Sequence, residues 1–241
     1  MSGARVLPLL LVGAVGCARG TTSSNPIDDV GDPARSADAG SNLGALGSLP
    51  EAGGTTGDGG DAAVATAVKP AAGDVLISEV MYNPSGVEPD SEWIEIANIS
   101  TGPRTLTGLT LKDGGDRTHL IEANVVVAPG AFVVLARSTA GAAAAKVPAT
   151  AVGYEYGAGL GSTSGIILAN GAAGSIALLD GSKVLVRADY GAFTLATEGK
   201  SVQLATLTVA ASTKAASWCV SEKRWATGAE MGTPGAAPDC P

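Results

Sequence analysis

From Asp74 onward, short apolar runs alternate with turn-forming residues. The segment EWIEIANI (Glu92–Ile99) has a period of two, which places its even and odd positions on opposite faces of a strand. Similar runs follow between Gly, Pro, Asn and Asp residues, and this spacing predicts an all-β sandwich or barrel. The other predicted strands lie in DVLISEVMYN, TLTGLTLKD, THLIEANVVV, APGAFVVLAR, SGIILANG, GSIALLDGSKVLVRADYG, GKSVQLA and ASWCVSE.

Two dipeptides predict where the chain reverses direction. Pro129-Gly130 separates two apolar runs, and Asp180-Gly181 lies between two alternating runs, which is a strong hairpin signal. One short helix is predicted within Ala140–Ala149, where alanine favours helix and Gly141 and Pro148 limit its length.

The composition divides the chain into segments. Residues 17–73 consist largely of Gly, Ser, Thr, Ala, Asp and Pro and contain no aromatic residue, so they cannot bury enough apolar surface to offset the entropy of ordering. We therefore expect a disordered tether at 17–73, with a β-sandwich domain at 74–241.

The N-terminus has the pattern of an export signal. A positively charged start is followed by the apolar run Val6–Gly16, which is too short to span a bilayer as a helix. Small residues then lead to Cys17, in a sequence that resembles the lipobox of bacterial lipoproteins, with Ala14 where that family usually has Leu. The resemblance implies that 1–16 is a signal peptide and that Cys17 carries lipid. The alternative is an ordinary cleaved signal peptide followed by a chance cysteine.

The three cysteines are Cys17, Cys219 and Cys240. An odd number in an exported protein leaves one thiol to explain, and lipidation of Cys17 would account for it. Cys219 and Cys240 would then form a disulfide in an oxidising compartment. Two separate reduced thiols are the alternative. A zinc site is not expected, because only His119 could join the two cysteines and four ligands are normal.

The formal net charge is −8, which argues against nucleic-acid partners and against docking on anionic lipid. Lys223-Arg224 is the only adjacent basic pair in the sequence.

Five carboxylates lie within Ser78–Ser100: Glu79, Glu88, Asp90, Glu92 and Glu95. Paired carboxylates act in hydrolases when burial raises the pKa of one of them. Nothing nearby supplies a nucleophile or an oxyanion site, so no catalytic residue is predicted. We expect instead that Glu79 and Glu92 cap or pair within the sandwich and that Glu95 faces solvent.

Five acidic residues are candidates for calcium ligands, because carboxylate oxygens suit this cation. Loop carboxylates in an acidic exported protein can also serve solubility alone. Calcium is thus the one candidate cofactor. The candidate ligands are Glu88, Asp90, Glu92, Asp113 and Asp116.

The order of several motifs resembles the lamin tail domain, an immunoglobulin-like β-sandwich found in nuclear lamins and in many bacterial extracellular proteins. These motifs are ISEVMYNPSG, EWIEIANIS, LTGLTLKDG, APGAFVVLAR, ILANGAAGSIALLDGSKVLVRADYG, EGKSVQL and the closing GTPGAAPDC. The resemblance extends over nearly the whole chain from Asp74 onward, and it implies an immunoglobulin-like sandwich.

Together these features predict a non-enzymatic, lipid-anchored protein of the cell envelope, exported and held at the cell membrane or outer membrane. Its sandwich would bind a protein or glycan partner, or another copy of itself, through loops or an edge strand. The alternative is a secreted accessory to a nuclease or hydrolase, with a calcium-binding acidic loop.

Overall fold

The computed structural model describes residues 66–193, 196–226 and 230–240. The described residues are mostly strands and turns, with three short helices and one 3₁₀ turn. The strands are β1 (Val75–Met81), β2 (Trp93–Asn98), β3 (Arg104–Thr105), β4 (Thr110–Asp113), β5 (Thr118–Leu120), β6 (Val126–Val127), β7 (Phe132–Ala136), β8 (Val152–Glu155), β9 (Ile176–Asp180), β10 (Lys183–Ala188), β11 (Val202–Leu204) and β12 (Trp218–Val220). The helical elements are α1 (Thr139–Ala144), α2 (Tyr190–Phe193), α3 (Val209–Ser212) and η1 (Ala215–Ser217).

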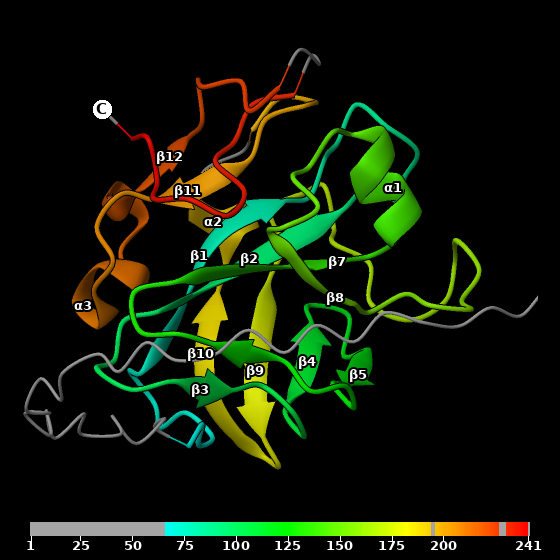
Figure 1. Cartoon of the computed structure of the whole chain (residues 1–241). Coiled ribbons are helices and arrows are strands. Elements are labelled where there is room, and N and C mark those ends of the chain that lie inside the picture. The colour runs from blue at the N-terminus through cyan, green and yellow to red at the C-terminus, as the bar shows by residue number, and fades with distance from the viewer. Residues whose placement is uncertain (1–65, 194–195, 227–229, 241) are drawn as a thin grey trace, which may run out of the picture. The chain divides into compact units, whose positions relative to one another are not determined.

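The strands form two main sheets and one small ribbon (Figure 1). The six-stranded sheet has the order β12-β11-β1-β2-β7-β8, and the four-stranded sheet has the order β10-β9-β4-β5. Strands β3 and β6 pair with each other in the ribbon. All these pairings are antiparallel except β7–β8, which is parallel. The predicted all-β, immunoglobulin-like sandwich is confirmed.

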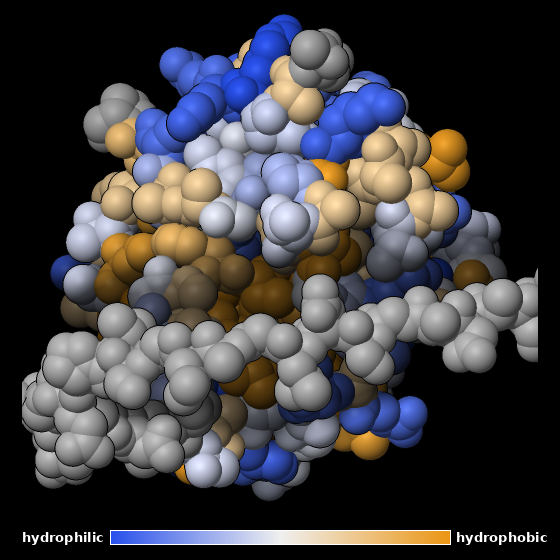
Figure 2. Space-filling view, in the orientation of Figure 1, coloured by the Kyte–Doolittle hydropathy of each residue, from blue (hydrophilic) through white to orange (hydrophobic). Residues whose placement is uncertain are grey.

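The main core lies between the two large sheets. Ile94 and Ile96, on one face of β2, are fully buried in the same apolar cluster as Leu111 of β4 and Leu178 of β9. On the face of the molecule shown in Figure 2, apolar residues lie across the middle and hydrophilic residues gather above and below them. The alternation seen in the sequence of β2 therefore directs its isoleucines to the core.

A second apolar cluster covers the other face of the six-stranded sheet. Trp93 of β2 and Val134 of β7 pack there with Ala142 of α1 and with Val147. Trp225 meets Trp93 edge to face, with ring centroids 5.9 Å apart. Strand β2 is consequently buried on both faces.

The predicted turns form as expected. Gly181 has φ +58° in the hairpin between β9 and β10, and Gly130 has φ +73° before β7. Both values lie in the left-handed region that glycine adopts without strain. The predicted helix is shorter than the range Ala140–Ala149, because α1 begins after its Ser138 cap and ends at Ala144.

The folded part extends upstream of the predicted domain start at Asp74. Val68 forms a bridge with Arg104, and the Lys69 ammonium lies 2.8 Å from the Asp180 carboxylate. Residues 66–73 are thus packed on the domain rather than belonging to a tether. The predicted signal peptide, Cys17 and the rest of the tether lie outside the described residues. Within the described residues, every helix falls short of the length and apolarity needed to cross a bilayer.

Residues 230–240, which we call the C-terminal cover, lie over the outer face of β1, β2 and β11 (Figure 1). The Asp239 amide donates to the Gln203 side chain of β11 at 2.9 Å. Cys240 is joined to Cys219 of β12 by a disulfide, which confirms the predicted pairing. The cover is therefore attached to the sheet by one covalent bond and by hydrogen bonds.

Reduction of this disulfide should destabilise the domain. The two cysteines are 21 residues apart, and opening a loop of this length costs about 3 kcal/mol of unfolding free energy in the chain-entropy model. The measurement is urea unfolding of the full chain, followed by tryptophan fluorescence, with and without reductant. Cys17→Ser serves as the control and should leave the unfolding midpoint unchanged. Equal midpoints in oxidised and reduced protein would contradict the prediction.

Candidate functional site

The acidic segment Ser78–Ser100 contributes two strands and the loop between them. Glu79 on β1 and Glu95 on β2 are directly opposite each other in the antiparallel pair. Both side chains are completely buried. The prediction that Glu95 faces solvent is wrong, because the C-terminal cover lies over the outer face of the sheet to which Glu95 points.

The Glu79 carboxyl is fully engaged by hydrogen bonds. Its Oε1 accepts from Ser201 Oγ at 2.5 Å and from the Thr233 amide at 2.9 Å, and its Oε2 accepts from Thr233 Oγ1 at 2.9 Å. Gly232 makes this approach possible, because a Cβ at that position would lie 2.5 Å from Glu79 Oε1. Glu79 thus pairs within the sandwich as expected. Its partners are Ser201, which lies just before β11, and Thr233 of the cover.

Glu95 has one partner on β1 and one on the cover. Its Oε1 accepts from Ser78 Oγ at 2.7 Å, and its Oε2 accepts from the Gly235 amide at 2.6 Å. Loss of water, together with the neighbouring Glu79 charge, raises the pKa of Glu95 to about 8. Burial also raises the pKa of Glu79. The pair therefore retains a proton at neutral pH.

Glu79 and Glu95 are the residue types that act as general acids and bases, but they lack access to a substrate. A general acid or base must come within hydrogen-bond reach of a substrate atom. Glu79 and Glu95 lie beneath the cover with no exposed surface. Their geometry serves to satisfy backbone amides of the cover, where the buried Thr233 would otherwise carry an unpaired donor.

Glu92 contacts the loop between β8 and β9. Its Oε2 accepts from the Leu168 amide at 2.8 Å, and burial raises the pKa of Glu92 to about 8. Nearby, the buried Arg137 donates through Nη2 to the carbonyls of Gly161 and Ser164, at 2.9 Å each. Glu92 and Arg137 together fix the glycine-rich chain between β8 and β9, so Glu92 has the capping role expected for it.

The other candidate calcium ligands of the acidic segment point to separate partners. Glu88 accepts two hydrogen bonds from the Asn170 side chain, at 2.9 and 3.1 Å. Asp90 lines a pocket next to α1, which is described below. Glu92 is occupied by the Leu168 amide.

Asp113 and Asp116 are likewise used within their own turn. Asp113 is buried and accepts from Arg117 Nε at 2.6 Å, while the exposed Asp116 pairs with Lys112 at 2.8 Å. Among the described residues, no three Asp, Glu, His or Cys side chains are placed to hold a metal ion together. The structure therefore does not bring the five candidate calcium ligands into one site.

The single histidine is also accounted for by a local contact. His119 Nε2 lies 2.7 Å from the hydroxyl of Tyr154 on β8. Partial burial lowers the pKa of His119, since the charged ring is disfavoured away from water. This His–Tyr contact joins β5 to β8.

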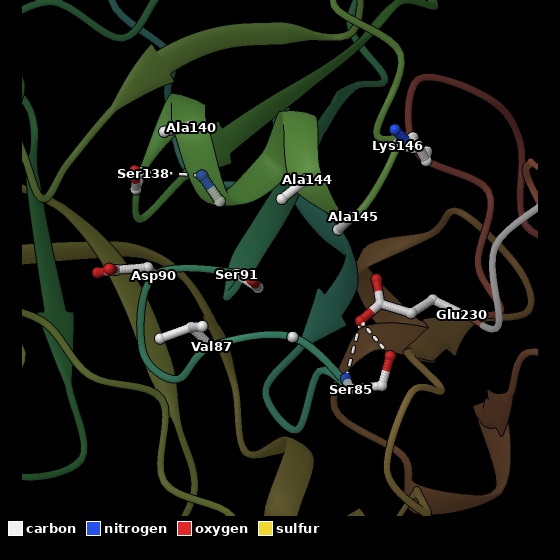
Figure 3. Close-up of a pocket in the computed structure, with 12 residues that line it drawn as sticks. Ser85, Val87, Asp90, Ser91, Ser138, Ala140, Ala144, Ala145, Lys146 and Glu230 are labelled. Carbon is white, nitrogen blue, oxygen red and sulfur yellow. Dashed lines mark hydrogen bonds between the residues drawn. The ribbon is translucent and has the colours of Figure 1, made fainter.

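A pocket of about 470 Å³ lies between the loop that precedes β2 and helix α1 (Figure 3). The two walls approach closely because Gly141 lacks a side chain: a Cβ there would clash with the Asp90 carbonyl. Glu230 of the cover closes one end, where its Oε1 accepts from the Ser85 amide and hydroxyl. Glu230 is not among the residues that the sequence predicts, because no local motif marks a residue whose site is built from three distant segments.

Comparison with known families places this fold. The model of the Lamin Tail Domain family matches residues 69–213, which is more than half of the chain. The chain belongs to the lamin tail domain family. This is generally a non-catalytic, immunoglobulin-like family. No curated protein matches the chain. The matched stretch of the lamin tail domain ends before β12 and the C-terminal cover, so Glu230, Thr233 and Gly235 lie outside it.

The buried carboxyls of this lamin tail domain should make its stability fall as pH rises. The pKa of Glu95 is about 8 in the folded state, against 4.5 for an ordinary glutamate. Below pH 4.5 both states are protonated and the full stabilisation is present. Between about pH 4.5 and 8 the unfolded chain loses its proton first, so the unfolding free energy decreases and then levels off. Melting temperatures measured from pH 5 to pH 9 should show this decline.

The matched variants for this prediction are Glu95→Gln and Glu198→Gln. Glu95→Gln keeps the shape of the side chain but cannot ionise, so its melting temperature should decline less steeply across this pH range. Glu198 is exposed, and its replacement should leave the slope unchanged. A Glu95→Gln slope equal to that of the natural sequence would show that this carboxyl does not titrate as described.

Proposed function

We propose that this chain is a lipid-anchored protein of the cell envelope and that its lamin tail domain is a binding module for a protein partner. The observation that carries the binding role is the pocket beside α1. The paired carboxyls of Glu79 and Glu95 are engaged by internal hydrogen bonds, whereas this pocket is open to solvent and lined by both apolar and charged residues. Concave sites of this size and composition are typical of ligand-binding pockets.

The anchoring role is supported by the N-terminal sequence. An apolar run too short to span a membrane precedes Cys17, as in bacterial lipoproteins. The described residues begin at 66, and the composition of the stretch after Cys17 predicts a tether long enough to hold the domain away from a surface. A flexible chain of this length has an r.m.s. reach of roughly 40 Å.

The net charge of −8 favours a protein or glycan partner over nucleic acid, whose binding depends on Lys and Arg contacts to phosphates. The pocket has aliphatic walls, and none of the described residues that line it is an aromatic on which a sugar ring could stack. We therefore favour a protein partner over a glycan. The alternative of a calcium-dependent accessory to a nuclease or hydrolase has no ligand set among the described residues to support it.

The anchor is tested by the mature N-terminus. In a bacterial host that processes lipoproteins, mass spectrometry should find a mature chain that begins at Cys17 and carries lipid on that residue. Cys17→Ser should move the protein from the membrane fraction to the soluble fraction, whereas the control Cys219→Ser should leave it with the membrane. A mature chain with an unmodified N-terminus at another residue would refute the anchor.

A further inference from the structure

The pocket beside α1 has aliphatic walls and an acidic end (Figure 3). Val87 of the loop lies on one side, and Ala140, Ala144 and Ala145 lie on the side of the helix. Glu230 approaches from the C-terminal cover. Three parts of the chain that are far apart in sequence therefore form a single concave surface.

The Glu230 carboxylate is only half satisfied by the protein. Its side chain is 5% exposed, and Oε1 accepts from the Ser85 amide at 2.8 Å and from Ser85 Oγ at 3.1 Å. The second oxygen, Oε2, is fully buried and has no hydrogen-bond donor among the described residues. Figure 3 shows this oxygen directed toward the end of α1 at Ala145.

Three of the other buried carboxyls, those of Glu79, Glu95 and Asp113, differ from Glu230 in this respect. Glu79 and Glu95 each have a donor on both oxygens, and Asp113 accepts from its own turn and from Arg117. Among the buried carboxyl oxygens of the described residues, Oε2 of Glu230 is the one without a partner. A buried charged acceptor without a donor is costly, so a cationic donor that enters the pocket gains a strong hydrogen bond there.

We propose that this pocket binds the side-chain ammonium of a lysine on the protein partner. On binding, the Glu230 side chain shifts so that Oε2, which is buried in the free protein, accepts from the ammonium, and the methylene stem lies along Val87 and the alanines of α1. This inference rests on the proposed function as a binding module, and it adds the chemical group that the module recognises.

The geometry favours lysine over arginine. A guanidinium pairs best with both oxygens of a carboxylate at once, and Ser85 already occupies one of them. An ammonium is a compact charge that needs one free oxygen. The apolar walls suit the four-carbon stem of lysine, because such stems pack along apolar surface while the charged end reaches a polar partner.

Two charged residues at the rim adjust the affinity in opposite directions. Asp90 adds a second negative charge to the lining, and the exposed Lys146 adds a positive one. In Figure 3 the Lys146 side chain lies beyond Ala145 and away from the Glu230 carboxylate. Removal of the Lys146 charge should therefore strengthen the binding of a cation and weaken the binding of an anion.

The test uses the purified full chain and three blocked tripeptides. The probes are acetyl-Gly-Lys-Gly-amide, the same peptide with an acetylated lysine ammonium, and acetyl-Gly-Arg-Gly-amide. Binding is followed by the NMR amide signals of Gly141 and Ala145, which line the pocket. The lysine peptide should bind with a dissociation constant on the order of millimolar, as expected for one ion pair with a little apolar contact. The acetylated and arginine peptides should bind at least about tenfold more weakly, because neither places a compact charge on Oε2.

Variants separate the contribution of each wall. Glu230→Gln should weaken binding of the lysine peptide at least about tenfold, since it removes one member of a buried charge pair. Lys146→Gln should strengthen it about two- to threefold. Ala144→Leu fills the pocket from the helix side and should abolish binding while Glu230 remains in place. Glu198→Gln, which changes an exposed carboxylate, should have no effect beyond about twofold. Melting temperatures of all four variants establish that each is folded.

Several results would overturn the proposal: no shift with the lysine peptide, equal binding of the acetylated peptide, undiminished binding to Glu230→Gln, or weaker binding to Lys146→Gln. The proposed function is tested separately, by lipidation of Cys17 and by a direct binding assay with a purified envelope protein. A partner that binds equally well to the natural chain and to Glu230→Gln would retain the module and reject the lysine pocket.

Discussion

Burial of strands β1 and β2 on both faces is the constraint on which the rest of this domain depends. On the inner side the four-stranded sheet supplies apolar partners, as sandwich folds require. On the outer side no second sheet is present among the described residues, and α1 and the C-terminal cover take its place. Because the cover is not a strand, its amides need acceptors other than a β-ladder. Glu79 and Glu95 provide them.

The sheet and the cover are therefore mutually dependent. Without the cover, Glu79 and Glu95 would be adjacent carboxyls on an exposed sheet, where they would both ionise and repel each other. Without the two carboxyls, the buried Thr233 amide would have no acceptor, and the Gly235 amide would lose its acceptor too. The arrangement places polar groups in the interior without leaving them unsatisfied.

Local features of the sequence predicted local features of the structure well. The alternation in Glu92–Ile99 and the turns at Gly130 and Gly181 each depend on residues close in the chain, so their outcome follows from short-range chemistry. The fate of Glu95 could not be predicted in this way, because its outer neighbour Gly235 is 140 residues distant. The role of Glu230 could not be predicted for the same reason, because its partner Ser85 lies 145 residues away. Alternation indicates which face a side chain occupies, but not what later covers that face.

The C-terminal cover belongs to the folded domain although it lies outside the stretch that matches the family. The family match ends at residue 213, and the strand β12, the disulfide and every cover residue follow it. A segment cut at that boundary would present β11 as an open edge, a known template for intermolecular strand pairing. The stretch that matches the family is therefore shorter than the stretch that covers this sheet. The residues after 213 contribute Trp218 to the main core and, through Thr233 and Gly235, the donors that the buried carboxyls accept from.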